Sequence, residues 1–481
     1  MKNTLIRLIA LMMAMCMIVC CVGCSEGEED VEIVYQYEDG TVPTEDGTTQ
    51  TQQQGDAATQ TDNNKNSATS STNSTTSNSK KPTSKVEKVI NDNVDPSKYK
   101  GTTITYATWR NPALYEDGPV VKEFEKKYGI KVKVDLMTEA QYTHSVLSKI
   151  SAKNSPDVFF STYTFPYCLE ALQPIDAAKL NLKESIWDDA LIDLATVKGK
   201  TYLVDTVGNI WKDEDMVVYN KKLFKGKTSP EDYYKAGKWN FETMQKCMQE
   251  IAAMGPDYIG GAVHLEGLIH SAGGHVIGLK NGKFFNDTKN TVTKDIMRWA
   301  SNGLKDGWLS TTSIYTALNQ FPTGKVGIAI LHSFSLKKTG YLRNMKSSEI
   351  GFVRLPAWKG KKATATSFVR GWGICKGAKN PVAAGIFLRY YLDVNNYNTS
   401  SAFISPEAEK FFFELTSTNT KNKNFYFCYG SGVTGITGKE SAVGDYISKP
   451  ATADPSQVVT EIDKYQNALN ADIAKLNKAM K

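Results

Sequence analysis

The chain has 481 residues, of which 41% are hydrophobic and 22% are charged, and its formal net charge is +6. This length and composition are typical of a globular protein with room for more than one hydrophobic core. A charge this small in a chain this long gives no indication of nucleic-acid binding, and we expect no nucleic-acid partner.

The N-terminal segment is typical of a bacterial signal peptide. A short basic stretch precedes an almost uninterrupted apolar run from Leu8 to Val22, which is too short to span a bilayer comfortably. The run ends in Cys21-Val22-Gly23-Cys24 and resembles a lipobox, in which a cysteine receives a diacylglycerol. Cys21 stands where lipoboxes usually have leucine, so an ordinary secretory signal is the alternative. We predict a signal peptide over 1–23, lipidation of Cys24 and a lipid-anchored position at the extracellular face of the cell membrane.

The composition changes sharply after the signal segment. Residues 24–97 are rich in Ser, Thr, Asn and Gln and contain few apolar side chains. Burial of so little apolar surface cannot offset the entropy lost on ordering the backbone. We therefore predict a disordered tether, with an r.m.s. span of about 45–50 Å for about 70 flexible residues.

The cysteines of the folded part give no evidence of a scaffold. They are far apart and contain no CxxC pair, so neither a disulfide framework nor a zinc ribbon is indicated. Buried free thiols and a single disulfide both fit their spacing. We also find no motif for a cofactor or a metal ion, and expect neither. The four positions are Cys168, Cys247, Cys375 and Cys428.

The folded part begins with alternating strand and helix patterns. Hydrophobic periodicity predicts strands at 103–107, 130–136 and 157–160, and helices at 118–128 and 139–150 between them. This order with short connections predicts a parallel sheet. Ligands of such sheets bind at the carboxyl ends of the strands, so the residues that follow each strand are site candidates.

A series of short motifs then follows along the chain. They are Tyr106 to Arg110, Phe124 to Val132, Ser155 to Phe160, Leu172 to Asp176, Val218 to Phe224, Gly237 to Phe241, Phe321 to Ile328, Leu355-Pro356 and Gly371 to Pro381. In their order and spacing they resemble the family 1 extracellular solute-binding proteins, the relatives of maltose-binding protein. The resemblance covers about 300 residues and is weakest from Val394 to Pro450.

The resemblance implies an α/β fold of two lobes, each a sheet flanked by helices, with a ligand cleft at the hinge. It implies a first lobe of 98–215 and 351–392, and a second lobe of 216–350 and 393–481 that ends in helices. The implied function is capture of a small ligand, a mono- or oligosaccharide, for the permease of an ABC importer. We expect the protein to work as a monomer.

A sugar ring presents an apolar C–H face and a rim of hydroxyl groups. Its site therefore needs aromatic rings together with planar polar side chains. The run Asp213 to Asp215 is interpreted as a solvated charge run, and His264 as a structural residue. The strand ends and the family-like loops give as candidate ligand contacts Trp109, Arg110, Tyr163, Trp211, His275, His332, Phe334, Arg370 and Trp372.

The sequence shows none of the common catalytic motifs. GxSxG, HExxH, Walker and calcium-loop patterns are all missing, so we do not expect an enzyme. A secreted glycan-active hydrolase is the less favoured alternative, because the two carboxylates of a glycosidase need not be close in sequence. The same fold could also serve surface polysaccharide capture or ligand sensing, and the sequence does not identify the ligand or its length.

Overall fold

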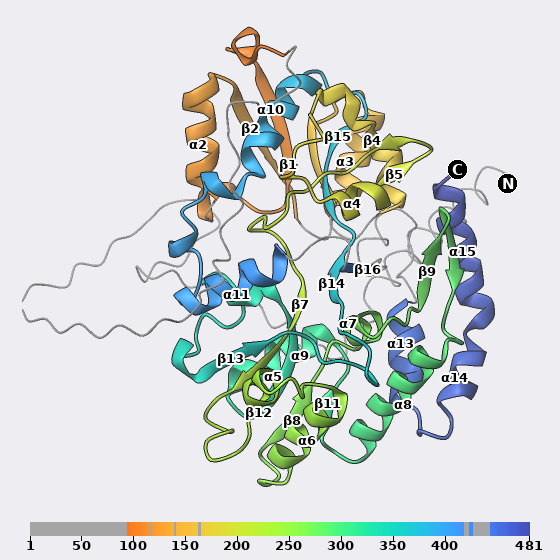
Figure 1. The fold of residues 1–481 in the computed structure, drawn as a ribbon. Coiled ribbons are helices and arrows are strands. Elements are labelled where there is room, and N and C mark those ends of the chain that lie inside the picture. Colours follow the sequence, from red (N-terminus) through yellow and green to blue (C-terminus); the bar gives the residue numbers. More distant parts are fainter. Residues whose placement is uncertain (1–93, 116, 139–140, 162–164, 418–422, 427–442) are drawn as a thin grey trace, which may run out of the picture. The chain divides into compact units, whose positions relative to one another are not determined.

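The computed structural model describes residues 94–115, 117–138, 141–161, 165–417, 423–426 and 443–481 (Figure 1). The chain divides into two compact units, 1–75 and 76–481, and every described residue belongs to the second. The predicted signal peptide, the lipidation site Cys24 and the tether up to residue 93 lie outside the described residues. No helix in the described part of the chain is long and apolar enough to cross a membrane.

The described part of the chain begins at residue 94, slightly before the predicted end of the tether at residue 97. A short 3-10 helix, η1 (Pro96–Tyr99), starts there, and the Asp95 side chain accepts a hydrogen bond from the Ser97 backbone N–H. Proline at the first helical position and an acidic cap favour this turn. The polar composition up to Ser97 therefore conceals a local helix signal.

The first lobe is built on a five-stranded sheet with the strand order β2-β1-β3-β15-β4. Strand β1 is parallel to β2 and β3, as predicted, whereas β15 returns late in the chain and is antiparallel to β3 and β4. Figure 1 shows α2 and α10 on one side of this sheet and α3 on the other. The elements are β1 (Thr103–Thr108), α2 (Asp117–Tyr128), β2 (Lys131–Leu136), α3 (Tyr142–Ser151), β3 (Val158–Ser161), β4 (Leu172–Gln173), α4 (Asp189–Leu194), β5 (Thr196–Val197), β6 (Lys200–Thr201), β15 (Gly371–Cys375) and α10 (Pro381–Tyr391).

The second lobe is built on a five-stranded mixed sheet with the order β11-β8-β12-β7-β13. Strand β8 is parallel to β11 and β12, and β7 is antiparallel to β12 and β13. The elements are β7 (Asp215–Asn220), α5 (Pro230–Lys235), α6 (Phe241–Ala252), β8 (Ile259–Ala262), α7 (Leu265–Ser271), β9 (Ile277–Lys280), β10 (Lys283–Asn286), α8 (Thr291–Lys305), β11 (Leu309–Thr311), α9 (Ile314–Gln320), β12 (Val326–His332) and β13 (Ile350–Val353).

The pairing of β13 corrects one expected boundary. Gly351, Phe352 and Val353 pair with β7, so residues 351–353 belong to the second sheet and not to the segment that returns to the first lobe. The alternating pattern of a short edge strand is weak in this stretch, and the sequence boundary was therefore placed three residues too early.

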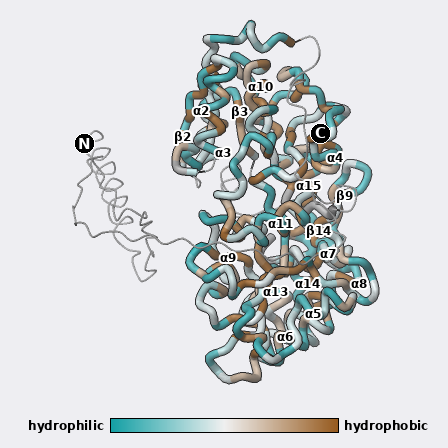
Figure 2. Tube along the Cα trace, turned by 60° about the vertical axis from the view of Figure 1, so that its left-hand side comes forward, coloured by the Kyte–Doolittle hydropathy of each residue, from teal (hydrophilic) through white to brown (hydrophobic). Residues whose placement is uncertain are grey.

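Strand β7 shows how these sheets are buried on both faces. Val217 and Tyr219 belong to one hydrophobic cluster, and Met216 and Val218 to another. Successive side chains of a strand point to opposite faces, so this strand is covered on both sides, which explains its continuous burial. In Figure 2 the hydrophobic stretches lie mostly in the strands and the helices beside them, whereas the peripheral loops are largely hydrophilic.

Among the described residues, three segments join the lobes: residues 205–214, 354–370 and 392–405. The first and third are tied together, because the Thr206 hydroxyl donates a hydrogen bond to the Leu392 carbonyl. The remaining helices follow the third segment, and α13, α14 and α15 pack on α8 and on strand β10 of the second lobe. Strand β14 (Ala365–Phe368) lies within the second segment, and the elements after the third are α11 (Pro406–Thr416), β16 (Lys423–Tyr426), α13 (Val443–Thr452), α14 (Val458–Lys464) and α15 (Gln466–Ala479).

Candidate functional site

The candidate site is formed where three segments meet: the loop after β1, the joining segment 205–214, and the 3-10 helix η7 (Ser333–Leu336) after β12. Arg110 comes from the first, Trp211 from the second and Phe334 from the third. The guanidinium carbon of Arg110 is 3.9 Å from the centre of the Trp211 ring and 5.4 Å from that of Phe334. Three residues chosen from the sequence are therefore brought together between the lobes.

Two further side chains complete this group. The Tyr115 ring centre lies 4.0 Å from the Arg110 guanidinium carbon, and the buried Lys337 places its Nζ 3.8 Å from the centre of the Trp211 ring. A cation this close to an aromatic face is attracted by the electrons of the ring. We call Arg110, Tyr115, Trp211, Phe334 and Lys337 the interlobe cluster. The sequence analysis missed Tyr115 and Lys337. The only feature of the sequence that could have indicated them is that each follows a candidate residue by a few positions.

Local hydrogen bonds fix the backbone that presents the cluster. The Thr108 hydroxyl accepts a hydrogen bond from the backbone N–H of Arg110. The Asn209 side-chain oxygen accepts one from the backbone N–H of Trp211. The Asp213 carboxylate accepts the backbone N–H of Phe334 at 3.1 Å. Such side-chain-to-backbone bonds favour turns over regular structure, and they hold each residue at the end of its strand or segment.

Several donors of the cluster are buried without a hydrogen-bond acceptor among the described residues. They are Nε and one Nη of Arg110 and the indole Nε1 of Trp211. A buried donor that bonds nothing is costly, and in native proteins it is usually satisfied by a side chain, a water molecule or a ligand. The cluster thus combines aromatic faces with N–H donors, which suits a ligand that carries both apolar faces and oxygen acceptors.

A polar group lies beside the cluster. Asp213 is 3.5 Å from Nη1 of Arg370 and 3.6 Å from Nδ1 of His332, measured at the same oxygen, Oδ2. Arg370 also donates a hydrogen bond to the carbonyl of Trp211. The predicted residues Arg370 and His332 therefore border the interlobe cluster, and burial lowers the pKa of His332.

The interpretation of residues 213–215 as a solvated run was wrong. All three side chains are buried, with Glu214 and Asp215 fully inaccessible to solvent. The physical reason is that basic groups from distant segments surround the run, while Asp215 already belongs to strand β7. Buried carboxylates are tolerated when such partners compensate them.

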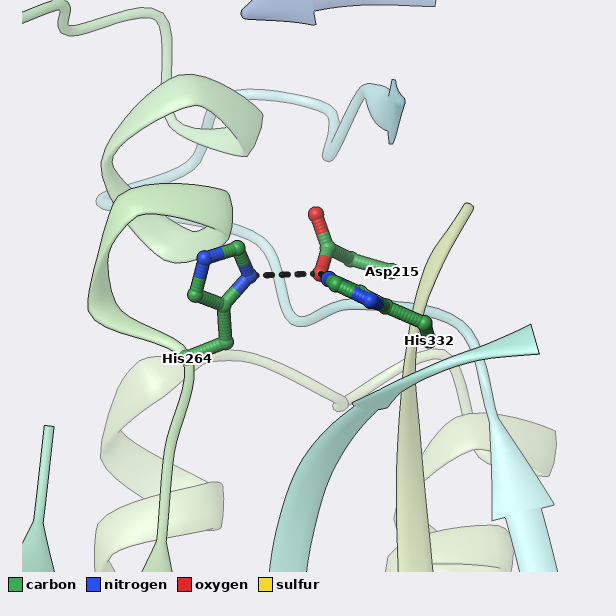
Figure 3. Close-up of side chains that lie close together, drawn as sticks. All are labelled: Asp215, His264 and His332. Atoms are coloured by element: carbon green, nitrogen blue, oxygen red, sulfur yellow. Dashed lines mark hydrogen bonds and ion pairs between the residues drawn. The ribbon is translucent and has the colours of Figure 1, made fainter. Parts of the chain in front are cut away.

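Asp215 lies between two histidine rings, as Figure 3 shows. Its Oδ1 is 2.8 Å from Nδ1 of His264 and 3.5 Å from Nε2 of His332. Burial alone would raise the pKa of Asp215, but the two histidines outweigh it and lower that pKa. Burial lowers the pKa of His264, yet the Asp215 carboxylate outweighs this and raises it. Two imidazoles and a carboxylate are also a set of atoms that can bind a metal ion.

The aromatic surface continues from the cluster into the first lobe. The partly exposed Trp109 stacks on Phe160, with ring centres 5.2 Å apart and an angle of 12° between the planes. The Phe160 ring centre is in turn 5.9 Å from the guanidinium carbon of Arg370. The sequence analysis assigned Phe160 only to a strand. The hydrophobic pattern of a strand cannot show that its ring contacts Trp109 and lies near Arg370.

Comparison with known protein families identifies the family of the chain. Residues 100–394 match the family described as bacterial extracellular solute-binding protein. The chain belongs to this family. The two lobes, the segments between them and the match agree with the family resemblance of the sequence motifs. A comparison with curated proteins finds no match.

Solved structures share the fold of this solute-binding protein. A Staphylococcus aureus extracellular solute-binding protein in complex with maltose is 14% identical, with a TM-score of 0.58 over 78% of this chain and 99% of that chain. Maltose-bound MalE3 of T. maritima is 18% identical, with a TM-score of 0.54 over 79% and 100%. The GacH receptor of Streptomyces glaucescens, solved unliganded and with acarbose, is 15% identical, with a TM-score of 0.53 over 77% and 98%.

Two residues predicted to bind ligand in this solute-binding protein lie elsewhere. Trp372 is only 2% exposed, because it is the second residue of β15 and its side chain points into the face covered by α10. Its ring stacks on that of Phe160, with 4.1 Å between the ring centres. Its indole N–H donates a hydrogen bond to Tyr106 Oη at 3.3 Å. Its place is the core of the first lobe, and the expectation of a ligand contact is corrected accordingly.

His275 also lies apart from the interlobe cluster. Its Nδ1 is 3.3 Å from Asp287, and its ring is 4.9 Å from that of His270, so its described contacts are within the second lobe. The glycines before it in the sequence suggested a close approach to ligand, but in the structure they turn the chain between α7 and β9. Tyr163 lies outside the described residues.

Proposed function

We propose that this solute-binding protein captures a mono- or oligosaccharide at the interlobe cluster and delivers it to the permease of an ABC importer. It would do so at the extracellular face of the cell membrane, held there by a lipid on Cys24. The observation that carries the proposal is the meeting of Arg110, Trp211 and Phe334, from both sides of the hinge, in one group of rings and buried N–H donors.

The chemistry of this group favours a carbohydrate. A pyranose ring offers C–H groups that pack on indole and phenyl faces, and its hydroxyl oxygens accept hydrogen bonds from guanidinium and indole N–H groups. Trp109 extends the aromatic surface through its stack on Phe160. The relatives of known structure support the same ligand class, since two of them hold maltose and one holds acarbose.

The position of the cluster also supports a function that depends on closure. Arg110 belongs to the first lobe and Phe334 to the second, while Trp211 lies on a segment between them. A ligand that contacts all three binds more tightly to the arrangement in which the lobes are close, and so shifts the population toward it. A closed, loaded form is what a permease could distinguish from an empty one.

The experiment is a thermal-unfolding screen of the full chain against monosaccharides, oligosaccharides, amino acids, peptides and polyamines. A ligand at a hundred times its Kd stabilises the native state by about 2.7 kcal/mol. In a protein of this size this corresponds to a rise of roughly a few degrees in the unfolding midpoint. We expect a shift with one saccharide series. A shift only with non-sugars would refute the carbohydrate assignment, and release of reducing sugar from an oligosaccharide would refute a pure binding function.

A further inference from the structure

Asp215, His264 and His332 form a compact group beside the interlobe cluster. Asp215 begins β7, His264 immediately precedes α7, and His332 ends β12, so the topology brings all three to the same end of the second sheet (Figure 3). One carboxylate oxygen and one ring nitrogen from each histidine lie within 4.8 Å of one another. All three side chains are buried.

We propose that these three residues form a binding site for a divalent transition-metal ion, of which Zn²⁺ fits the donor set best. Zn²⁺ takes imidazole nitrogens and carboxylate oxygens at about 2.0–2.2 Å, so neighbouring donors of a tetrahedral site lie about 3.3–3.5 Å apart. Asp215 Oδ1 is 2.8 Å from His264 Nδ1 and 3.5 Å from His332 Nε2. All three donors lie within 4.8 Å of one another, so side-chain adjustment alone would bring them to coordination distance, with a fourth position left for water.

The groups around the three donors orient them as the surroundings of a metal site do. The Thr366 hydroxyl donates to Oδ2 of Asp215 at 2.7 Å, which leaves Oδ1 turned toward the two imidazoles. The other ring nitrogen of His332, Nδ1, faces Oδ2 of Asp213 at 3.6 Å. A carboxylate behind a ligating histidine is a recurrent arrangement in zinc sites, because it fixes the ring and its tautomer.

The surroundings also leave room for an ion to enter. A cavity of about 260 Å³ reaches Asp215, and its other walls include Thr364 and Ala365. Helix α7 passes so close to Asp215 that a Cβ at Gly267 would stand 2.5 Å from its carboxylate. Asp215 therefore packs tightly against α7 and also lines a cavity, so an ion that entered the cavity would come close to this carboxylate.

A bound ion would tie the hinge to the second lobe. Asp215 immediately follows the joining segment 205–214, and Thr366, its hydrogen-bond partner, lies in the joining segment 354–370. Asp213, behind His332, also holds the backbone of Phe334 in the interlobe cluster. The ion would thus stabilise two of the three segments between the lobes, independently of which solute the cluster binds.

The test uses the full chain, stripped of metal by a chelator and then titrated with Zn²⁺ in competition with a chromophoric chelator. We expect one Zn²⁺ per chain and a rise of roughly a few degrees in the unfolding midpoint on saturation. His332→Ala and Asp215→Asn should weaken Zn²⁺ binding at least about tenfold. His144→Ala is the matched control, because it removes an exposed histidine far from the group and should leave binding unchanged.

Co²⁺ provides a readout that does not depend on the variants folding. In the folded wild-type chain we expect visible absorption bands of Co²⁺ bound to nitrogen and oxygen donors, and their loss when Zn²⁺ is added. Stoichiometric binding that His332→Ala and Asp215→Asn leave unchanged would overturn the proposal, as would the lack of both bands and thermal shift in the wild-type chain. None of these results depends on sugar binding, so they fail or succeed separately from the proposed function.

Discussion

The guanidinium group of Arg110 rests on the ring of Trp211, with 3.9 Å between the guanidinium carbon and the ring centre. Arg110 belongs to the loop after the first strand of one lobe, and Trp211 to a segment that leads into the other. Trp211 is held from behind, because its carbonyl accepts a hydrogen bond from Arg370. Because this contact joins the first lobe to a segment between the lobes, it lies at the centre of the proposed solute site.

Arg110→Ala and Trp211→Ala should each weaken binding of the solute found in the screen by about tenfold or more. A hydrogen bond from a charged donor contributes about 1.5–3 kcal/mol, and an aromatic face in contact with the ligand adds to that. Isothermal titration calorimetry measures the change. Arg298→Ala is the matched control, since Arg298 is partly exposed on α8 and pairs with Asp295 away from the cluster. Equal affinity in all three variants would contradict the site.

Trp372→Ala should reduce stability rather than affinity. The side chain is almost fully buried between Phe160 and Tyr391, so its removal leaves a cavity in the first lobe. Replacing a buried tryptophan with alanine costs about 3–5 kcal/mol. Urea unfolding measures this loss, and Trp372→Phe should recover a large part of it. If instead the stability were unchanged and sugar affinity fell, Trp372 would be a ligand contact after all.

Lys212 forms a buried ion pair whose loss should be costly. Its Nζ lies 2.7 Å from Asp188 and 3.0 Å from Asp205, and its side chain is only 4% exposed. Burial lowers the pKa of Lys212, but the two carboxylates outweigh burial and raise it. A lysine with a raised pKa in the folded state contributes stability below its unfolded pKa and loses it only as pH rises through the folded value. The pair is therefore intact at neutral pH.

Lys212→Met should accordingly destabilise the protein by about 3–5 kcal/mol near pH 7, because two buried carboxylates lose their cation. Denaturant titration at neutral pH checks this. Lys305→Met is the control, since Lys305 is exposed and its pairing with Asp454 is screened by water. We expect the control to unfold almost like the wild type, and similar losses in the two variants would show that burial is not the cause.

Cys24→Ala should release the protein from membranes. A diacylglycerol on this thiol is the proposed anchor, and without it no described helix could replace it. Cell fractionation and mass spectrometry of the mature N-terminus measure the outcome, with Cys21→Ala as the matched control. A Cys24→Ala protein that stays in the membrane fraction would point to the alternative signal or to another anchor.

The fold could be predicted from the sequence where local periodicity coincides with the final structure. The strands at 103–107 and 130–136 and the helix at 118–128 have almost their observed bounds, because each has a clear apolar face and a glycine or polar residue at its end. Strand β15 could not be placed in the first sheet from its own pattern. It pairs with β3 after a separation of about 200 residues, which only the family resemblance indicated.

The candidate site could be predicted in part. Arg110, Trp211 and Phe334 follow strands or precede a crossing between lobes, so position and residue type agree. Trp372 lies in the core instead, because a tryptophan near a loop can point to either face of its strand. The group of Asp215, His264 and His332 was missed because its members come from three distant segments and show no metal-binding spacing, and only the folded sheet places their donors together.

The cysteines in the described part of the chain should resist modification as long as the protein is folded. Among the described cysteines, Cys168, Cys247 and Cys375 form no disulfide and are buried. Burial raises the pKa of the Cys247 thiol to about 12 and also raises that of Cys375. The thiolate is the reactive form, and with a pKa near 12 only about one thiol in ten thousand is ionised at pH 8.

Alkylation followed by peptide mass spectrometry should therefore label these positions rapidly in urea and very slowly in native buffer. Any reaction of the native protein should accelerate only in strongly alkaline solution. Rapid native labelling of Cys247 would show that α6 opens locally, because neither its ionisation nor its access to solvent permits reaction in the folded state.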